Sequence, residues 1–203
     1  MQLDHIAVAG KTLEEATEAV ESALGVFLQP GGQHDLFATH NRLLGLADGF
    51  YIEAIATDPS VRPPKRQRWF DLDDFSGPAR LTNWICRTDD IAAILPGLPD
   101  GVGMPVALQR GDLCWLMAVP ADGKLPYDNM FPALIEWQGS LHPGAMLAPS
   151  GCALRRLVVA HPHADALAGI LAPVLRDAKV VFEPGPTGLM AEIDTPNGLR
   201  VLR

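Results

Sequence analysis

The segment LDHIAVAG, residues 3–10, reads as a short β-strand that ends at a glycine. It is apolar except for Asp4 and His5, and the two-residue period of a strand puts His5 on the face opposite Ile6. A histidine at this place is either a satisfied residue at the edge of a core or the first ligand of a site on the sheet. The rest of the chain favours the second reading.

The next segment, residues 11–25, predicts a helix, because its apolar residues recur at helical spacing. Thr12 and Glu15 form a capping box at its start, and Gly25 stands where a helix is expected to stop. Gly-Gly and Asp-Gly turn signals separate the strand-like stretches that follow. These are VFLQPGG (residues 26–32), DLFATHNRLLGL (35–46) and GFYIEAIAT (49–57), which gives the order βαβββ.

The same order recurs twice along the chain. A second copy starts with the strand RLTNWICRT (residues 80–88) and a short helix at DDIAAILPGL (89–98), and a third copy starts near Cys152. Segments rich in Pro, Gly and charge separate the copies, as connections between modules should be. We therefore expect one compact unit with modules at residues 1–58, 80–139 and 152–203 and linkers at 59–79 and 140–151.

This repeat predicts an α+β fold. A single βαβββ module cannot bury its own apolar face, so two copies are expected to pair into a curved mixed sheet with helices on the outer face. The hollow between the paired copies is a natural pocket. We expect modules one and two to form this cup and module three to pack beside it.

The charge balance limits the classes of partner. The chain has 16 Lys and Arg against 24 Asp and Glu, a net charge of −8, which argues against nucleic acid or an anionic membrane as the main partner. The run RPPKRQR, residues 62–68, is either a solvated stretch or an edge where Arg66 or Arg68 binds a carboxylate. No phosphate-binding glycine loop is present, so no nucleotide cofactor is expected.

Cysteine usage and hydropathy bear on the compartment. Three widely spaced cysteines, odd in number, fit reduced thiols better than a disulfide framework or a CxxC metal site. The apolar runs are far shorter than the ~20 residues that span a bilayer, and no signal peptide is visible. We expect a cytoplasmic protein.

The first module carries a resemblance to a known family. The segments LDHIAVAG, GGQHDLFATHNRLLGLADGFYIEAIATDP (residues 31–59) and RLTNWICRTDDI (80–91) resemble the vicinal oxygen chelate superfamily and, within it, the glyoxalase-like domain family of largely uncharacterised bacterial proteins. The first module matches over its whole length, the second is recognisable, and the third matches in pattern. The fold implied is the one expected from the repeat.

The resemblance implies a metal site. In the superfamily, side chains from the first and last strands of each module bind a divalent metal, and the matching positions here are His5, Glu53, Asn83 and Glu136. One imidazole and two carboxylates suit Zn, Fe, Mn, Ni or Co, so His5, Glu53 and Glu136 are the expected ligands. Asn83 departs from the usual His or Gln. The alternative is that all four residues form a hydrogen-bonded network in a metal-free pocket.

A second cluster contains His34, His40 and Asn41. Strand alternation puts His40 and Asn41 on opposite faces, and His34, after two glycines, is expected in a loop over the pocket mouth. His34 or His40 is the candidate acid–base partner, with Glu136 as a further catalytic candidate, and Asn41 and Asn83 are candidate binding residues. For each histidine alone, a structural role bonded to backbone remains the competing reading.

The tryptophans are interpreted mainly as core. Trp137 adjoins Glu136 and is therefore expected on the face away from the pocket, whereas Trp69 and Phe70 in the linker have a second reading as a lid.

Two functions follow as expectations. The first is a metal-dependent lyase, isomerase or dioxygenase that acts on a small oxygenated molecule. The second is a metal-free protein of the same fold that binds or sequesters a small molecule. Superfamily members often pair modules across subunits, so the resemblance also implies a homodimer as one arrangement.

Overall fold

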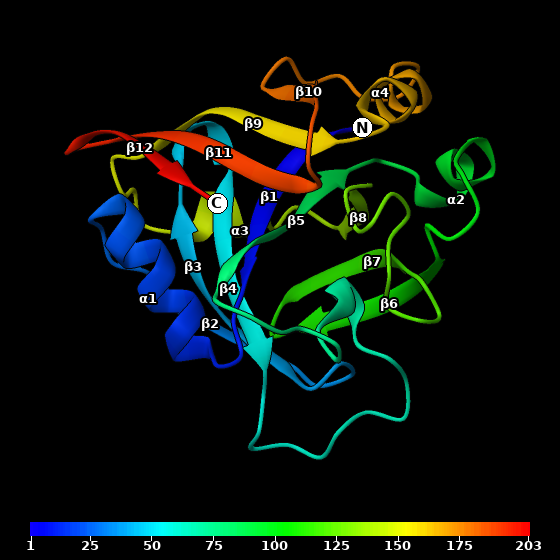
Figure 1. Cartoon of the computed structure of the whole chain (residues 1–203). Coiled ribbons are helices and arrows are strands. Elements are labelled where there is room, and N and C mark those ends of the chain that lie inside the picture. Colours follow the sequence, from blue (N-terminus) through cyan, green and yellow to red (C-terminus); the bar gives the residue numbers. More distant parts are fainter.

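The computed structural model describes residues 1–203 and contains an eight-stranded and a four-stranded sheet (Figure 1). The large sheet has the order β2-β3-β4-β1-β5-β8-β7-β6, which places the first and second modules side by side. Its strands are β1 (Gln2–Ala9), β2 (Gln29–His34), β3 (Thr39–Gly45), β4 (Tyr51–Thr57), β5 (Arg80–Arg87), β6 (Met104–Arg110), β7 (Leu113–Val119) and β8 (Ala133–Gln138). The α+β class and the curved mixed sheet are as predicted.

The two modules share one strand arrangement. In each, the first strand pairs in parallel with the last, as β1 does with β4 and β5 with β8. The first strands of the two modules, β1 and β5, pair with each other in antiparallel fashion and so join the modules at the middle of the sheet. Consequently β2 and β6 form the two outer edges, and the concave face between them is the cup.

The first helix, α1 (Leu13–Leu24), has the predicted ends. The backbone N–H of Glu15 donates to the Thr12 hydroxyl, and the Glu15 carboxylate accepts from the N–H of Lys11. Gly25 ends the helix in a left-handed conformation, with φ of 71°. Its buried stripe includes Ala16, Val20 and Leu24 and packs against β4 on the outer face of the sheet (Figure 1).

In the second module the helix is short. Asp90 caps α2 (Ile91–Ile94) by accepting from the N–H of Ala93, as the acidic start of this segment predicts. A single turn of 3-10 helix at Leu95–Gly97 ends it, because Pro96 cannot continue the hydrogen-bond ladder.

The third segment has the predicted element order but not the strand pairing of the other two. Its elements are β9 (Ala153–His161), α4 (Ala164–Leu171), β10 (Val180–Pro184), β11 (Gly188–Thr195) and β12 (Gly198–Leu202). Here the first strand β9 pairs in parallel with β10 and in antiparallel fashion with β11, so the last strand β12 lies at an edge. The element order in a sequence does not determine which strands pair, and the expected third copy of the module differs for that reason.

This four-stranded sheet packs behind the middle of the large sheet. Trp84 of β5 is fully buried, contacts Phe182 of β10 edge to face, and donates to the carbonyl of Met130. The N–H of Leu3 donates to the carboxylate of Asp177. The third segment therefore covers the outer surface of the strand that carries His5, and one continuous hydrophobic core spans both sheets.

The two linkers cover other parts of the cup. The first contains a turn of 3-10 helix at Trp69–Asp71, in which Trp69 and Phe70 are buried. Phe70 and Asp71 both have positive φ, 60° and 56°, a conformation that costs about 1–3 kcal/mol for a non-glycine residue. The second linker contains α3 (Pro143–Met146), preceded by His142.

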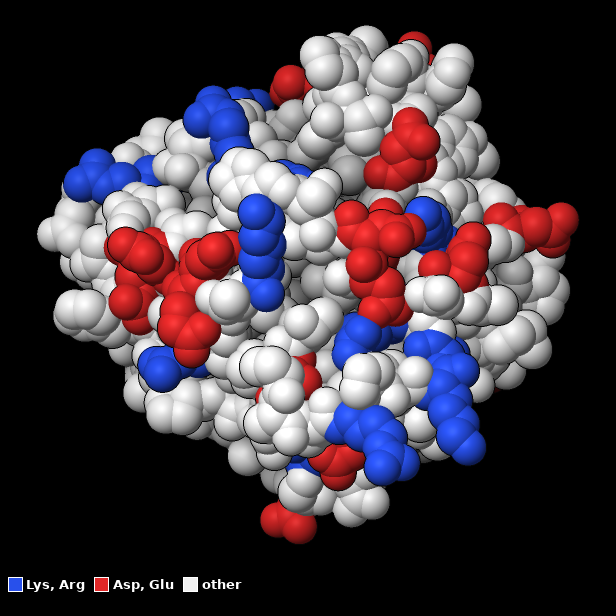
Figure 2. All heavy atoms as spheres, turned by 60° about the horizontal axis from the view of Figure 1, so that its bottom comes forward, with Lys and Arg blue, Asp and Glu red and all other residues white.

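No helix of the protein is long and apolar enough to cross a membrane. On the face that includes the first linker, Lys and Arg side chains lie between Asp and Glu side chains, and patches of both signs are visible (Figure 2).

Candidate functional site

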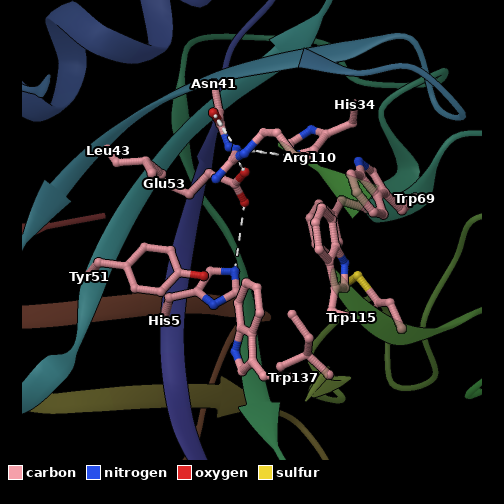
Figure 3. Close-up of a pocket in the computed structure, with 13 residues that line it drawn as sticks. His5, His34, Asn41, Leu43, Tyr51, Glu53, Trp69, Arg110, Trp115 and Trp137 are labelled. Carbon is pink, nitrogen blue, oxygen red and sulfur yellow. Dashed lines mark hydrogen bonds and ion pairs between the residues drawn. The ribbon is translucent and has the colours of Figure 1, made fainter. Parts of the chain in front are cut away.

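A narrow cavity lies in the cup, between the strands of the first module and those of the second (Figure 3). Its free volume is about 30 Å³, which is room for about two water molecules. Polar side chains of β1, β2, β3 and β4 line one side, and tryptophans of the first linker, β7 and β8 line the other. Its lining is His5, His34, Asn41, Leu43, Tyr51, Glu53, Trp69, Phe70, Arg110, Trp115, Met117, Ile135 and Trp137.

A β-bulge in β1 starts the polar side of the site. The register between β1 and β5 shifts between Leu3 and His5, so Asp4 is the extra residue. Bulges re-aim side chains. Here the bulge lets the carboxylate of Asp4 bond the ring of its own neighbour, with 2.6 Å between Asp4 Oδ1 and His5 Nδ1. This bond explains why the two polar residues stand together in an apolar strand.

Asp4 is a buried carboxylate with three side-chain partners. Its side chain is fully buried, and its Oδ2 accepts from Nε2 of His142 at 2.8 Å and from the indole N–H of Trp137 at 3.1 Å. Burial by itself would raise the pKa of Asp4, but the hydrogen bonds from His142 and His5 outweigh it and hold the pKa well below its ordinary value. Asp4 is therefore an anion that accepts hydrogen bonds from all three partners.

The tautomer of His5 follows from this arrangement. Because the Asp4 carboxylate can only accept, Nδ1 of His5 carries a proton, and the lone pair of the neutral ring is on Nε2. Nε2 faces the carboxylate of Glu53, with 3.7 Å to Oε2. Tyr51 stacks on the imidazole with 4.3 Å between ring centroids, which fixes its plane. Both His5 and Glu53 are almost fully buried.

Glu53 has a second polar neighbour on the opposite side from His5. Its Oε1 accepts from Nδ2 of Asn41 at 2.5 Å. The amide oxygen of Asn41 in turn accepts from the backbone N–H of Gly32 at 2.8 Å and from the guanidinium of Arg110 at 3.1 Å. The order of contacts is therefore Asp4, His5, Glu53, Asn41 and Arg110. Figure 3 shows the last four of these residues around the cavity.

Arg110 comes from the far edge of the large sheet. It is the last residue of β6, and its side chain crosses to β2, where one Nη lies 3.4 Å from Nε2 of His34. The close approach requires a glycine: a Cβ on Gly32 would lie 2.6 Å from Cδ of Arg110. A Cβ on Gly31 would lie 2.1 Å from the amide oxygen of Asn41. The two glycines thus admit the two side chains.

His34 is a neutral member of the cluster. Its Nδ1 is 3.0 Å from the hydroxyl of Thr39, and two donors, from Asn41 and Arg110, face its Nε2. Burial, with a smaller contribution from the positive charge of Arg110, lowers the pKa of His34 to about 4. The ring is therefore uncharged at neutral pH and accepts hydrogen bonds at Nε2.

The opposite wall is aromatic. The indoles of Trp115 and Trp137 lie next to each other, with 5.5 Å between ring centroids, and Trp69 contacts His34 edge to face at 5.0 Å. Trp69 also stacks on Phe37 at 4.2 Å, which holds the first linker against the cup. Trp69 and Phe70 both line the cavity, and their role as a lid stays a prediction.

Four of the predicted site residues come together here. His5, Glu53, His34 and Asn41 all line the cavity. The alternation expected in β3 is also present, because Asn41 faces the cavity whereas His40 is on the other face, 3.9 Å from the carboxylate of Asp58. His34 is in β2 rather than in a loop, because its backbone pairs with Thr39 of β3.

Glu136 does not join them. Its Oε2 accepts from the backbone N–H of Ile91 at 2.7 Å, so it stabilises the start of α2 on the outer face. The prediction that it is a ligand beside His5 and Glu53 is wrong, and so is the prediction that Trp137 faces away from the pocket. The sequences YIEAI (residues 51–55) and LIEWQ (134–138) look alike around the two glutamates, but the two strands do not turn these glutamates to the same face. In β8 it is Ile135 and Trp137 that face the cup.

The other candidate binding residues lie elsewhere. Asn83 pairs with Ala7 in the register of β1 and β5 and lines a different cavity. The guanidinium of Arg66 lies over the ring of Phe37, at 4.7 Å from its centroid. Arg68 forms an ion pair with Asp73 and donates to it through its backbone N–H at 2.7 Å, which fixes the linker. Neither arginine lines the cavity.

Sequence reasoning missed several residues of the site. The sequence did indicate a role for Asp4, since a carboxylate in a buried strand requires hydrogen-bond partners. Tyr51 precedes Glu53 by two residues and therefore shares its face, which the strand period could have shown. No sequence pattern pointed to Arg110 and Trp115, because only the pairing of the two modules brings β6 and β7 to the cavity.

The donor set does not match the predicted metal site. His5 and Glu53 converge, but no group of three or more His, Cys, Asp or Glu side chains able to hold a metal ion is present. The third predicted ligand, Glu136, is on the outer face. The neighbours of Glu53 on its other side are the N–H donors of Asn41 and the cationic Arg110, which suit an anion better than a metal cation.

Known proteins resemble this chain in family and fold. A family model described as a glyoxalase-like domain matches residues 3–175. The structure of a hypothetical protein from Staphylococcus aureus superposes with a TM-score of 0.64 at 15% identity, over 92% of this chain and 86% of that one. A methylmalonyl-CoA epimerase from Mycobacterium tuberculosis gives 0.43 at 20% identity, over 68% and 88% of the respective chains. No curated protein matches the chain.

Proposed function

Because the chain belongs to the glyoxalase-like domain family, with the fold of the vicinal oxygen chelate superfamily, we propose that it transfers a proton on a small oxygenated molecule, as an isomerase or lyase. In this proposal His5 removes a proton next to a carbonyl group, and Arg110 binds the oxygen that gains the negative charge. The observation that carries the proposal is the buried hydrogen bond from His5 Nδ1 to Asp4, which leaves Nε2 as the free basic atom in the cavity.

The Asp4–His5 pair has the properties of an oriented general base. An ionised carboxylate that accepts from Nδ1 selects the tautomer with its lone pair on Nε2, and it stabilises the imidazolium that forms when Nε2 takes a proton. Tyr51 stacks on the ring and keeps Nε2 directed at the cavity. Glu53, 3.7 Å from Nε2, is placed to take part in returning a proton to the product.

Arg110 supplies the positive charge that such a step requires. When the carbon–hydrogen bond breaks, its proton goes to Nε2 of His5 and its electron pair moves onto the carbonyl oxygen. A guanidinium stabilises this oxygen anion, and a preorganised donor of this kind contributes about 10²- to 10³-fold in rate. The residues do not complete a metal site, so no step is assigned to a metal.

The narrow cavity requires that a cover moves before a substrate enters. About 30 Å³ accommodates no organic substrate, and the side chains of Trp69 and Phe70 occupy the cup beside it. The first linker, in which Phe70 and Asp71 adopt left-handed conformations, is the segment that we expect to shift.

Exchange of substrate hydrogen tests the proposal without knowledge of the product. The protein is incubated in D₂O with a panel of 2-oxo acids, 2-hydroxy ketones and thioesters, and NMR follows the loss of the hydrogen next to the carbonyl. We expect catalysed exchange for at least one of these classes. In His5→Gln the rate should fall by about 10²- to 10⁴-fold, the usual contribution of a general base.

His40→Gln is the matched control, because His40 is a histidine of the same module on the other face of β3. It should exchange at the wild-type rate. The absence of exchange for every class in the panel, or equal rates for His5→Gln and wild type, would rule the proposal out.

A second candidate is a metal-free binding protein, and the aromatic wall favours it. Trp69, Trp115 and Trp137 together present a surface on which a planar ligand can stack. A thermal-shift comparison separates the two functions: stabilisation by aromatic ligands together with no hydrogen exchange in the panel supports binding alone.

A further inference from the structure

A second and larger cavity lies beside the site, on the other side of the first linker. Its free volume is about 600 Å³. The linker after Phe70, the first residues of β5, the loop at residues 128–130 and the start of β11 surround it. Phe70 lines both cavities and therefore lies between them. A volume of this size accommodates an organic ligand.

Asn83 is the feature of this cavity that requires an explanation. The residue is fully buried, and neither its amide nitrogen nor its amide oxygen has a hydrogen-bond partner. Burying such a group without a partner costs free energy, which is why buried amides are almost always bonded. The neighbouring Thr82 shows the ordinary case, because its hydroxyl donates to the carbonyl of Ala7 at 3.3 Å.

The charged groups around the cavity do not form hydrogen bonds with the amide of Asn83. They are engaged with one another or with backbone: Asp74 with Lys124 at 2.8 Å, Asp128 with His161 at 3.3 Å, and Arg80 with the carbonyls of Ser76 and Pro78. Asp71 accepts from Asn129, and Arg203 is exposed. The unmet hydrogen-bonding capacity in the wall of this cavity is therefore that of an uncharged amide, with one donor side and one acceptor side.

Two strained segments meet at the wall of this cavity. Phe70 and Asp71 have positive φ, and so do Tyr127, Asp128 and Asn129, at 57°, 53° and 68°. A hydrogen bond of 3.3 Å from Asn129 Nδ2 to Asp71 Oδ2 connects the two segments. Backbone strain of this kind concentrates at ligand-binding sites.

We propose that this cavity is a second binding site, specific for a ligand that carries a lactam, carboxamide or pyrimidine edge. Such an edge has an N–H donor beside a carbonyl acceptor. The amide of Asn83 has almost no exposed surface in the unliganded protein, so the edge pairs with both of its atoms when the ligand displaces the side chains that cover it. The apolar remainder of the ligand packs against Phe70, Phe75 and Leu189, which line the same cavity. The proposal concerns a site separate from His5 and Glu53 and holds whether or not the protein transfers protons there.

The test uses 2-pyridone, which has this edge, and N-methyl-2-pyridone, which lacks the donor. NMR on isotope-labelled protein follows the side-chain amide signals of Asn83, assigned by their loss in Asn83→Leu. With wild type we expect a saturable shift of these signals by 2-pyridone, with Kd in about the millimolar range for so small a probe, and at least about 10-fold weaker binding of the methylated compound. The measurement on wild-type protein is sufficient to overturn the proposal, which fails if the two compounds bind with equal affinity or if neither gives a saturable shift.

Two variants make the test specific. Asn83→Leu removes the amide and should abolish 2-pyridone binding, while Thr82→Val removes a neighbouring polar group that already has a partner and should bind as wild type does. Because Leu replaces a group with unmet hydrogen bonds, unliganded Asn83→Leu should melt higher than Thr82→Val, by about 2–4 °C or more. Undiminished binding of 2-pyridone to Asn83→Leu overturns the assignment.

Discussion

Asp4 and His5 are consecutive residues of one strand, and yet their side chains are hydrogen bonded to each other, with 2.6 Å between Oδ1 and Nδ1. Regular strand geometry would point them to opposite faces. The bulge at Asp4 removes this obstacle and brings both side chains to the concave face, where His142 and Trp137 complete the shell of the carboxylate. The site thus depends on a local irregularity of the backbone.

Asp4→Asn tests the role of this bond. An amide at this position can offer its N–H to His5, which favours the tautomer with the proton on Nε2 and removes the free basic atom. We expect hydrogen exchange on the substrate to fall by about 10²-fold or more, toward the loss seen for His5→Gln. Exchange at the wild-type rate in a folded Asp4→Asn protein would contradict the assigned tautomer.

Because the pKa of Asp4 is lowered in the folded protein, we expect the protein to lose stability in acid. The pKa of Asp4 is below its ordinary value in the folded protein, so below about pH 4 the unfolded chain binds a proton that the folded chain does not. The contribution of Asp4 is complete above the unfolded pKa and is lost as the pH falls toward the folded one. Melting temperatures between pH 6 and pH 2 should fall less steeply for Asp4→Asn than for wild type.

His34 gives a separate signature at higher pH. Its pKa is lowered to about 4, whereas an unfolded histidine titrates near 6.5, so the unfolded state gains the extra proton between these values. Stability should therefore decrease as the pH falls from about 7 toward 4, by up to about 3 kcal/mol for this group. Urea unfolding of wild type and His34→Gln at both pH values measures it. An equal decrease in the two proteins would show that His34 does not titrate in this way.

Gly32→Ala tests how Arg110 reaches the site. The new Cβ would lie 2.6 Å from Cδ of Arg110, so the arginine side chain must move away. We expect hydrogen exchange to fall by about 10-fold to 10³-fold while the protein remains folded. Gly169→Ala is the control, since a Cβ there meets nothing within 4 Å and a helical Ala is more favourable than Gly. Full activity of Gly32→Ala would show that Arg110 is not needed.

Glu136→Ala tests whether Glu136 acts on the outer face of the sheet or in the cup. Its carboxylate bonds the first N–H of α2, so the variant should lose about 1 kcal/mol of stability, comparable to a helix cap. Hydrogen exchange on the substrate should be unchanged. A loss of about 10²-fold or more with intact folding would instead support the ligand or catalytic role that the sequence predicts for Glu136.

The repeat made the fold predictable, because a βαβββ order that occurs twice in succession implies paired modules. The faces of β1, β3 and β4 were also predictable, since His5, Asn41 and Glu53 each follow the two-residue period. The bulge at Asp4 and the register of β8 were not. Both depend on how strands meet across the sheet, and a shift of one residue exchanges Glu136 for Trp137 at the cavity.

Other features depend on contacts between distant segments. Nothing local distinguishes Arg110 from an exposed arginine at a strand end, and nothing local shows that β9 pairs with β10 rather than with β12. His142 likewise reaches Asp4 from a linker that has no periodic pattern. These are decided by packing between modules, which a single sequence does not display.

The connection between β6 and β2 has a mechanical consequence. These strands are the two free edges of the large sheet. The side chain of Arg110 in β6 contacts His34 in β2 and Asn41 in the next strand, β3, and no backbone ladder joins the two edges. The rim can therefore widen and narrow by exchanging a few side-chain hydrogen bonds with water, while every strand keeps its paired neighbours. The side chain of Arg110 therefore holds the two edges of the sheet together, and the same residue is proposed to bind the oxygen anion.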